Sequence, residues 1–160
     1  ASENGPKLWK VLREAGEEFG LIPCGLGARD ALRLEAAMPL YGHELSADIN
    51  PYEAGLGIFV KLDKPDFIGR SALEQARPVQ RRRVGLKMTG RGIARETCPV
   101  YDGDRQVGVV TSGTHCPWVN QAVALALVET AYKDPGTPLS VDVRGRRVEA
   151  EIVRTPFYKR

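Results

Sequence analysis

Apolar and polar positions alternate at helical spacing near the start of the chain. Residues 7–19 contain apolar side chains three or four positions apart with charged residues between them: Leu8, Val11, Leu12 and Ala15. Such spacing places the apolar side chains on one helix face and predicts an amphipathic helix that begins near residues 4–6. Strong helix formers over residues 28–37 predict a second helix, which Pro39 ends. Residues 70–76 are predicted to form a third, short helix.

The second half of the chain has the pattern of short strands separated by turns. Six strands are predicted, at residues 83–88, 99–101, 106–112, 122–128, 139–143 and 147–153. Asp102-Gly103-Asp104 and Arg144-Gly145-Arg146 lie where hairpin turns are expected. This spacing is typical of a small antiparallel barrel or sandwich. Earlier in the chain, the apolar run Leu56–Leu62 also predicts a strand.

The change of pattern near residues 78–81 predicts a domain boundary. Residues 1–78 have a mixed α/β character with too few strands for a sheet of their own, whereas residues 79–160 are rich in strands. The sequence has no initiator methionine and runs within a few residues into a predicted helix. We therefore expect a piece of a longer protein, in which the first part relies on partners outside this sequence.

Composition excludes several classes of protein. The 160 residues are 42% hydrophobic and 27% charged, which is ordinary globular usage and excludes a disordered chain. The net charge is only +3, with acids among the bases, so the one-sided basic face of a nucleic-acid-binding protein is not expected. No apolar stretch approaches the ~18 residues that span a bilayer, so no membrane partner is expected. The three cysteines lie far apart without a C-x-x-C, which favours reduced thiols in a cytosol-like compartment.

The glycine-rich segment Gly25–Asp30 opens the second predicted helix. A helix start can bind an anion, but the dinucleotide fingerprint needs a third glycine and a preceding strand, and both are missing. Arg29 is unusual because a cation in the first turn opposes the helix dipole, so a carboxylate partner or a ligand is a natural reason for it. Two interpretations stay open: a structural ion pair with Asp30 or Glu35, or ligand binding.

The other polar motifs favour structural roles. His43 and His115, with Cys116 beside the latter, do not match the spacing of zinc ligands, so no metal is expected. Adjacent side chains on a strand point apart, which argues against a Cys/His nucleophile pair. Thr111–Thr114 is predicted as a polar loop between two strands. Arg81–Arg83 is either a solvated strand start or a docking patch for an acidic partner.

Several segments in fixed order resemble the aminomethyltransferase of the glycine cleavage system, the T-protein. They are Gly25–Tyr41 (GLGARDALRLEAAMPLY), Pro51–Lys64 (PYEAGLGIFVKLDK), Asp66–Leu73 (DFIGRSAL), Val107–Thr114 (VGVVTSGT), Val123–Val128 (VALALV) and Pro156-Phe157-Tyr158. The resemblance covers nearly the whole chain. Because members of the family are more than twice as long, the chain is similar to their C-terminal part.

The resemblance implies an α+β fold within a three-domain cloverleaf around a folate site. Residues 1–78 would end the α/β folate-binding domain, and residues 79–160 would form a small antiparallel, Greek-key-like β-barrel. The implied reaction transfers an aminomethyl group from the lipoyl arm of H-protein to tetrahydrofolate and releases ammonia. The family's folate-binding motif arginine falls on Arg29, and Met38 lies where some relatives present an aromatic side chain to the folate.

The resemblance also implies that essential parts lie outside this chain. The family's catalytic aspartate and a folate-binding glutamate lie upstream, so no catalytic residue is expected here. The chain alone is expected to be inactive, and its uncovered N-terminal faces are expected to drive dimerisation. The implied location is the bacterial cytoplasm, or the mitochondrial matrix in a eukaryote.

Two other functions stay open at this stage. The chain could be the folate domain of a dimethylglycine- or sarcosine-oxidising enzyme, which requires a flavin domain upstream, or a non-catalytic folate-binding or partner-docking module. The related tRNA-modifying folate proteins carry a K-G-C motif that this chain lacks. Relatives usually read S-G-T-x-S-P-T-L where this chain has Ser112–Val119 (SGTHCPWV).

Overall fold

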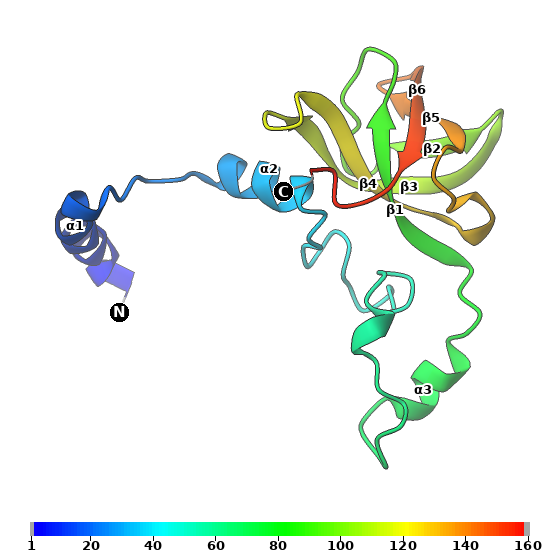
Figure 1. Ribbon diagram of the computed structural model, residues 1–160, viewed down its shortest axis with the longest axis horizontal. Coiled ribbons are helices and arrows are strands. Elements are labelled where there is room, and N and C mark those ends of the chain that lie inside the picture. Colours follow the sequence, from blue (N-terminus) through cyan, green and yellow to red (C-terminus); the bar gives the residue numbers. More distant parts are fainter. Residues whose placement is uncertain (1, 159–160) are drawn as a thin grey trace.

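Six antiparallel strands close into a barrel in the second half of the chain (Figure 1). The computed structural model describes residues 2–158. The strands are β1 (Arg81–Met88), β2 (Pro99–Asp102), β3 (Arg105–Cys116), β4 (Gln121–Glu129), β5 (Pro138–Val143) and β6 (Arg146–Val153). All six predicted strands are therefore confirmed.

The strand order around the barrel is that of a Greek key. Neighbouring strands follow the order β1-β4-β3-β2-β5-β6, and β6 pairs with β1 to close the barrel. Hairpins connect β2, β3 and β4 in sequence, while β1 lies beside β4, which is the Greek-key arrangement. The predicted α+β fold with a small antiparallel barrel is confirmed.

Alternation of side chains along each strand fills the barrel interior. In β5 and β6 every second residue is buried, and these residues belong to one core with the inward side chains of β1 to β4. Strand β4 is buried on both faces: Ala124, Ala126 and Val128 point into the barrel, whereas Val123 and Leu125 join a second cluster outside it. This double burial explains why the β4 sequence is an almost continuous apolar run.

The helices lie outside the barrel (Figure 1). They are α1 (Gly5–Gly16), α2 (Leu26–Glu35) and α3 (Arg70–Gln75), with short 3-10 turns at Ser2–Asn4, Glu17–Phe19, Gly57–Phe59 and Thr130–Tyr132. The three predicted helices are confirmed. Helix α2 packs on the outer face of β3 and β4, because Leu34 and the following Ala37 contact Cys116, Val123 and Leu125. Helix α1 contains no buried residue and stands away from the barrel. No helix within residues 2–158 has the length and apolarity needed to cross a bilayer.

The predicted strand at Leu56–Leu62 is wrong. Gly55 adopts a left-handed backbone (φ 78°), and the chain then forms the 3-10 turn Gly57–Phe59. Ile58 and Phe59 are 74% and 72% exposed. An extended run needs a neighbouring strand to satisfy its backbone, and among residues 2–158 none pairs with this segment.

The arginine run at the start of β1 attaches the segment after α2 to the barrel. Arg81 Nε donates to Glu53 Oε1 (2.9 Å), Arg82 Nη1 to the Tyr52 carbonyl (3.0 Å) and Arg83 Nη1 to the Ala37 carbonyl (2.9 Å). The run therefore serves an internal attachment, which neither interpretation of the sequence anticipated.

The division of the chain at residues 78 and 79 stays a prediction, and the barrel core supplies a test of it. That core draws only on residues 84–152. A chain of residues 79–160 is expected to be soluble and to unfold cooperatively in urea, at a lower midpoint than the whole chain because deletion uncovers Val123 and Leu125. Urea titration followed by circular dichroism checks this. A shortened chain that forms only aggregates would show that the boundary is misplaced.

Candidate functional site

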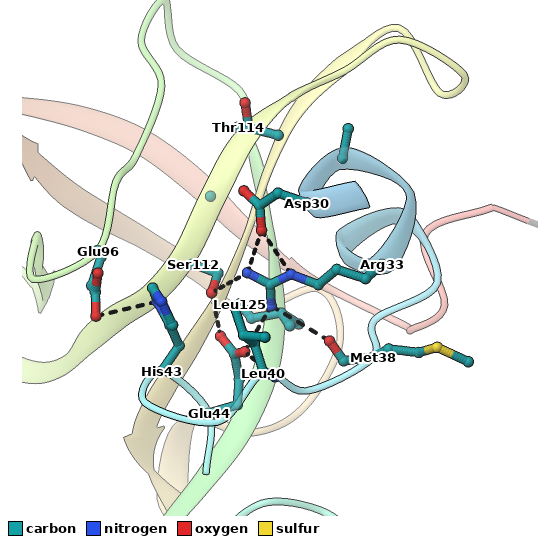
Figure 2. Close-up of polar contacts among 12 residues, drawn as sticks. Asp30, Arg33, Met38, Leu40, His43, Glu44, Glu96, Ser112, Thr114 and Leu125 are labelled. Atoms are coloured by element: carbon teal, nitrogen blue, oxygen red, sulfur yellow. Dashed lines mark hydrogen bonds and ion pairs between the residues drawn. The ribbon is translucent and has the colours of Figure 1, made fainter. Parts of the chain in front are cut away.

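Glu44 is the centre of a buried polar cluster between α2 and β3 (Figure 2). Its side chain is fully buried (0% exposed). The carboxylate accepts four hydrogen bonds: from Arg33 Nη1 (2.8 Å), the Leu40 amide (3.0 Å), Thr111 Oγ1 (2.6 Å) and Ser112 Oγ (2.6 Å). A buried carboxylate is tolerated only when it is paired and hydrogen-bonded, and this one is both.

A β-bulge explains how two successive residues of β3 reach the same carboxylate. Neighbouring side chains on a regular strand point to opposite faces. The pairing with β4 shifts here, since Val110 lies opposite Ala126 and Ser112 lies opposite Leu125, which leaves Thr111 as the extra residue. Both hydroxyls can therefore donate to Glu44 Oε1. The predicted polar loop at Thr111–Thr114 is wrong because these residues continue β3 through the bulge.

Arg33 connects this cluster to α2. Its Nε donates to Asp30 (2.8 Å), Nη1 to Glu44 (2.8 Å) and Nη2 to Ser112 Oγ (2.9 Å), and Nη1 also lies 3.4 Å from the Met38 carbonyl oxygen. The side chain is only 10% exposed. These contacts use the whole planar fork of the guanidinium, which an ammonium group could not reproduce.

The cluster holds Glu44 in its charged form. Burial opposes ionisation, but the hydrogen bonds from Ser112, Thr111 and the Leu40 amide, together with the charge of Arg33, outweigh it and lower the pKa of Glu44 below its usual 4.5. Because the pKa is lower in the folded than in the unfolded chain, ionised Glu44 stabilises the fold above about pH 4.5. That stabilisation is lost as the pH falls through the pKa of the folded state.

Glu44→Gln should therefore flatten the acid dependence of stability. Between pH 6 and pH 3 the melting temperature of the parent chain is expected to fall more steeply than that of Glu44→Gln, because the variant has lost this one titrating group. Thermal unfolding at half-unit pH steps measures the difference. Glu74→Gln, at an exposed ion pair, is the control and should follow the parent curve. Parallel curves for the parent and Glu44→Gln would contradict the assignment.

Arg29 is exposed in the first turns of α2, one turn before Arg33. The two acids proposed as its structural partners are used elsewhere: Asp30 pairs with Arg33, and Glu35 accepts a hydrogen bond from the Trp118 amide (2.9 Å). Within residues 2–158, no carboxylate lies at ion-pair distance from the Arg29 guanidinium. The ion-pair interpretation is therefore wrong for the described chain, and ligand binding by Arg29 stays a prediction.

Met38 lies just beyond the end of α2 and is 61% exposed. Its side chain points away from the cluster in Figure 2, while its carbonyl faces Arg33. Arg29 and Met38 are thus both linked to Arg33, the first along the helix and the second through its backbone.

The histidines and Cys116 do not form a reactive group. His43 Nδ1 lies 3.2 Å from both the Thr111 carbonyl oxygen and Glu96 Oε1, whereas His115 is exposed on β3. Burial, with the nearby charges of Glu35 and Asp30, raises the pKa of Cys116 to about 11, so its thiol stays protonated near neutral pH. Across residues 2–158, no set of three or more His, Cys, Asp or Glu side chains gathers to bind a metal.

Arg33 and Glu44 were not predicted from the sequence. The spacing of Arg33, three residues after Asp30 and four after Arg29, was a usable signal because such residues share a helix face. Glu44 gives no comparable signal, since it lies in a turn-rich segment and its hydroxyl partners come from 67 and 68 residues later.

Comparison with known proteins identifies the family to which the chain is similar. The family model of the "Glycine cleavage T-protein C-terminal barrel domain" matches residues 81–159, and that of the "GCVT N-terminal domain" matches residues 1–64. The chain belongs to the glycine cleavage T-protein family. The resemblance noted from the sequence motifs is therefore confirmed.

Individual family members resemble the chain over nearly its whole length. The aminomethyltransferase of Anoxybacillus flavithermus is 49% identical over 162 residues, which cover 99% of this chain and 44% of the relative. That of Synechococcus sp. strain CC9902 is 54% identical over 99% of this chain and 43% of the relative. The chain thus spans less than half the length of these curated relatives.

A solved structure shows the same fold. The crystal structure of glycine cleavage system aminomethyltransferase T from Bartonella henselae superimposes with a TM-score of 0.80 at 34% sequence identity. The match covers 84% of this chain and 39% of that protein.

Proposed function

We propose that the chain is the C-terminal portion of a tetrahydrofolate-dependent aminomethyltransferase of the glycine cleavage system. Its proposed reaction transfers the aminomethyl carbon from lipoyl-carrying H-protein to tetrahydrofolate and releases ammonia. The family membership, together with relatives named aminomethyltransferase, supports this reaction. The proposed location is the bacterial cytoplasm, in line with the bacterial relatives.

The exposed guanidinium of Arg29 is the observation that carries the proposal. Arg29, near the start of α2, fits an acidic ligand such as folate, because its guanidinium has planar donors for a carboxylate or carbonyl group and no ion-pair partner within residues 2–158. Tetrahydrofolate would supply the acceptor for the one-carbon group. Arg29 would bind and orient it, and Met38, beyond the other end of α2, would offer it an exposed apolar side chain.

The experiment is an ammonia-release assay with the full-length protein. The protein is incubated with aminomethylated H-protein, with and without tetrahydrofolate, and release is expected only when the folate is present. The 160-residue chain alone should release none, since the family's aspartate lies outside it. Folate binding by the full-length protein without ammonia release would instead indicate a non-catalytic module.

The 160-residue chain is expected to dimerise through the apolar face of α1. Leu8, Trp9 and Leu12 are each more than half exposed on this helix, and Ile22 after it is 74% exposed. An apolar surface of this kind promotes association. Sedimentation velocity should show a dimer that Trp9→Glu with Leu12→Glu converts to a monomer. Control substitutions at the polar face, Lys10→Glu with Glu14→Lys, should leave the dimer intact. A parent chain that stays monomeric at high concentration would contradict this prediction.

A further inference from the structure

We infer that Arg33 and Glu44 are positioning residues for the two proposed folate-binding residues, Arg29 near the start of α2 and Met38 just beyond its end. The inference rests on the proposed function, because it takes Arg29 as a folate-binding residue. The barrel strand β3 would then take an indirect part in folate binding, because we propose no contact between its own side chains and the folate. The buried pair would transmit the position of β3 to Arg29 and Met38.

The contacts run from β3 to Asp30, the sequence neighbour of Arg29, and to the backbone of Met38. Ser112 Oγ donates to Glu44 and accepts from Arg33 Nη2, so the strand contacts both members of the pair (Figure 2). Arg33 then reaches Asp30, the residue next to Arg29, and the Met38 carbonyl.

The geometry of the pair suits positioning more than it suits stability. An apolar pair of similar volume would often hold two elements together as well as a buried ion pair does. The ion pair also fixes orientation. All three nitrogens of the planar Arg33 guanidinium donate hydrogen bonds, and these bonds restrain both the rotation of α2 about its axis and its position along β3. Arg29 lies one turn earlier on the same helix face, so a rotation of α2 would displace its guanidinium from the ligand.

A double-mutant cycle on tetrahydrofolate affinity tests the inference in the full-length protein. Arg33→Lys keeps the charge but loses the fork, and it is expected to weaken tetrahydrofolate binding about tenfold, measured by calorimetry. In the background of Arg29→Ala, the same change should weaken binding less than about twofold, because Arg33 acts through Arg29. Arg70→Lys, at an exposed ion pair on α3, is the matched control and should change neither value.

Further readouts separate positioning from a purely structural role. In turnover, Arg33→Lys should raise KM for tetrahydrofolate and leave KM for H-protein unchanged. Should Arg33→Lys fail to fold, Ser112→Ala removes one contact to each member of the pair and should give a smaller, equally non-additive loss. A lowered melting temperature with unchanged affinity, or losses that simply add to that of Arg29→Ala, would overturn the inference. If Arg29→Ala itself leaves affinity unchanged, the proposed role of Arg29 fails instead, and the two failures are distinguishable.

Discussion

Glu44→Leu is expected to lower the free energy of unfolding of the 160-residue chain by about 3–5 kcal/mol, the usual cost of breaking a buried ion pair by removing one partner. The substitution would leave buried polar groups without their partner. Arg33 is only 10% exposed and would lose the carboxylate of Glu44 as its buried counter-charge, and the Leu40 amide would lose its hydrogen-bond acceptor. Thr111 and Ser112 would lose the acceptor that both share. Urea unfolding followed by circular dichroism measures the loss.

Two further variants make this result specific to the buried pair. Glu74→Leu removes an exposed carboxylate that also pairs with an arginine, and it should cost only about 0–1 kcal/mol. The double variant Glu44→Leu with Arg33→Met should recover part of the loss, because removing both charges leaves neither unpaired. A Glu44→Leu chain as stable as Glu74→Leu would mean that the cluster does not hold α2 to the barrel.

Arg29→Ala is expected to weaken tetrahydrofolate binding by the full-length protein ten- to a hundredfold. Loss of a hydrogen bond to a charged group costs about 1.5–3 kcal/mol, which corresponds to that range. Its melting temperature should stay nearly unchanged, because no carboxylate within residues 2–158 pairs with the guanidinium. Arg29→Lys should restore little of the affinity, since a point charge does not reproduce the planar fork.

Calorimetric titration of tetrahydrofolate into each variant measures the effect. Arg91→Ala, at another exposed arginine, serves as the control and should bind like the parent protein. Unchanged affinity of Arg29→Ala together with a lower melting temperature would make Arg29 a structural residue.

The barrel could be predicted from the sequence because each of its strands and hairpin turns is marked by a pattern within a short segment of the chain. Alternating apolar residues mark β5 and β6, and glycines mark two hairpin turns: Gly103 between β2 and β3, and Gly145 between β5 and β6. None of these signals needs knowledge of the rest of the chain. The apolar run Leu56–Leu62 also predicted a strand from local sequence, yet it contains the 3-10 turn Gly57–Phe59, because a local pattern does not show whether a neighbouring strand exists.

Of the candidate site, the sequence predicts only the residue that a single helix turn makes conspicuous. Arg29 is conspicuous as a cation at a helix start. Glu44 is not, because its environment depends on a bulge in β3 that turns Thr111 and Ser112 to the same side. The bulge depends in turn on the register between β3 and β4, which no short segment of the sequence specifies.

The most direct test of the proposed function measures both products of the reaction catalysed by the full-length protein, at increasing concentrations of tetrahydrofolate. Ammonia and methylenetetrahydrofolate are expected to form in equal amounts from aminomethylated H-protein. Arg29→Ala should raise KM for tetrahydrofolate and leave KM for H-protein unchanged. Ammonia release that does not depend on tetrahydrofolate, or no release from a protein that binds it, would contradict the proposed function.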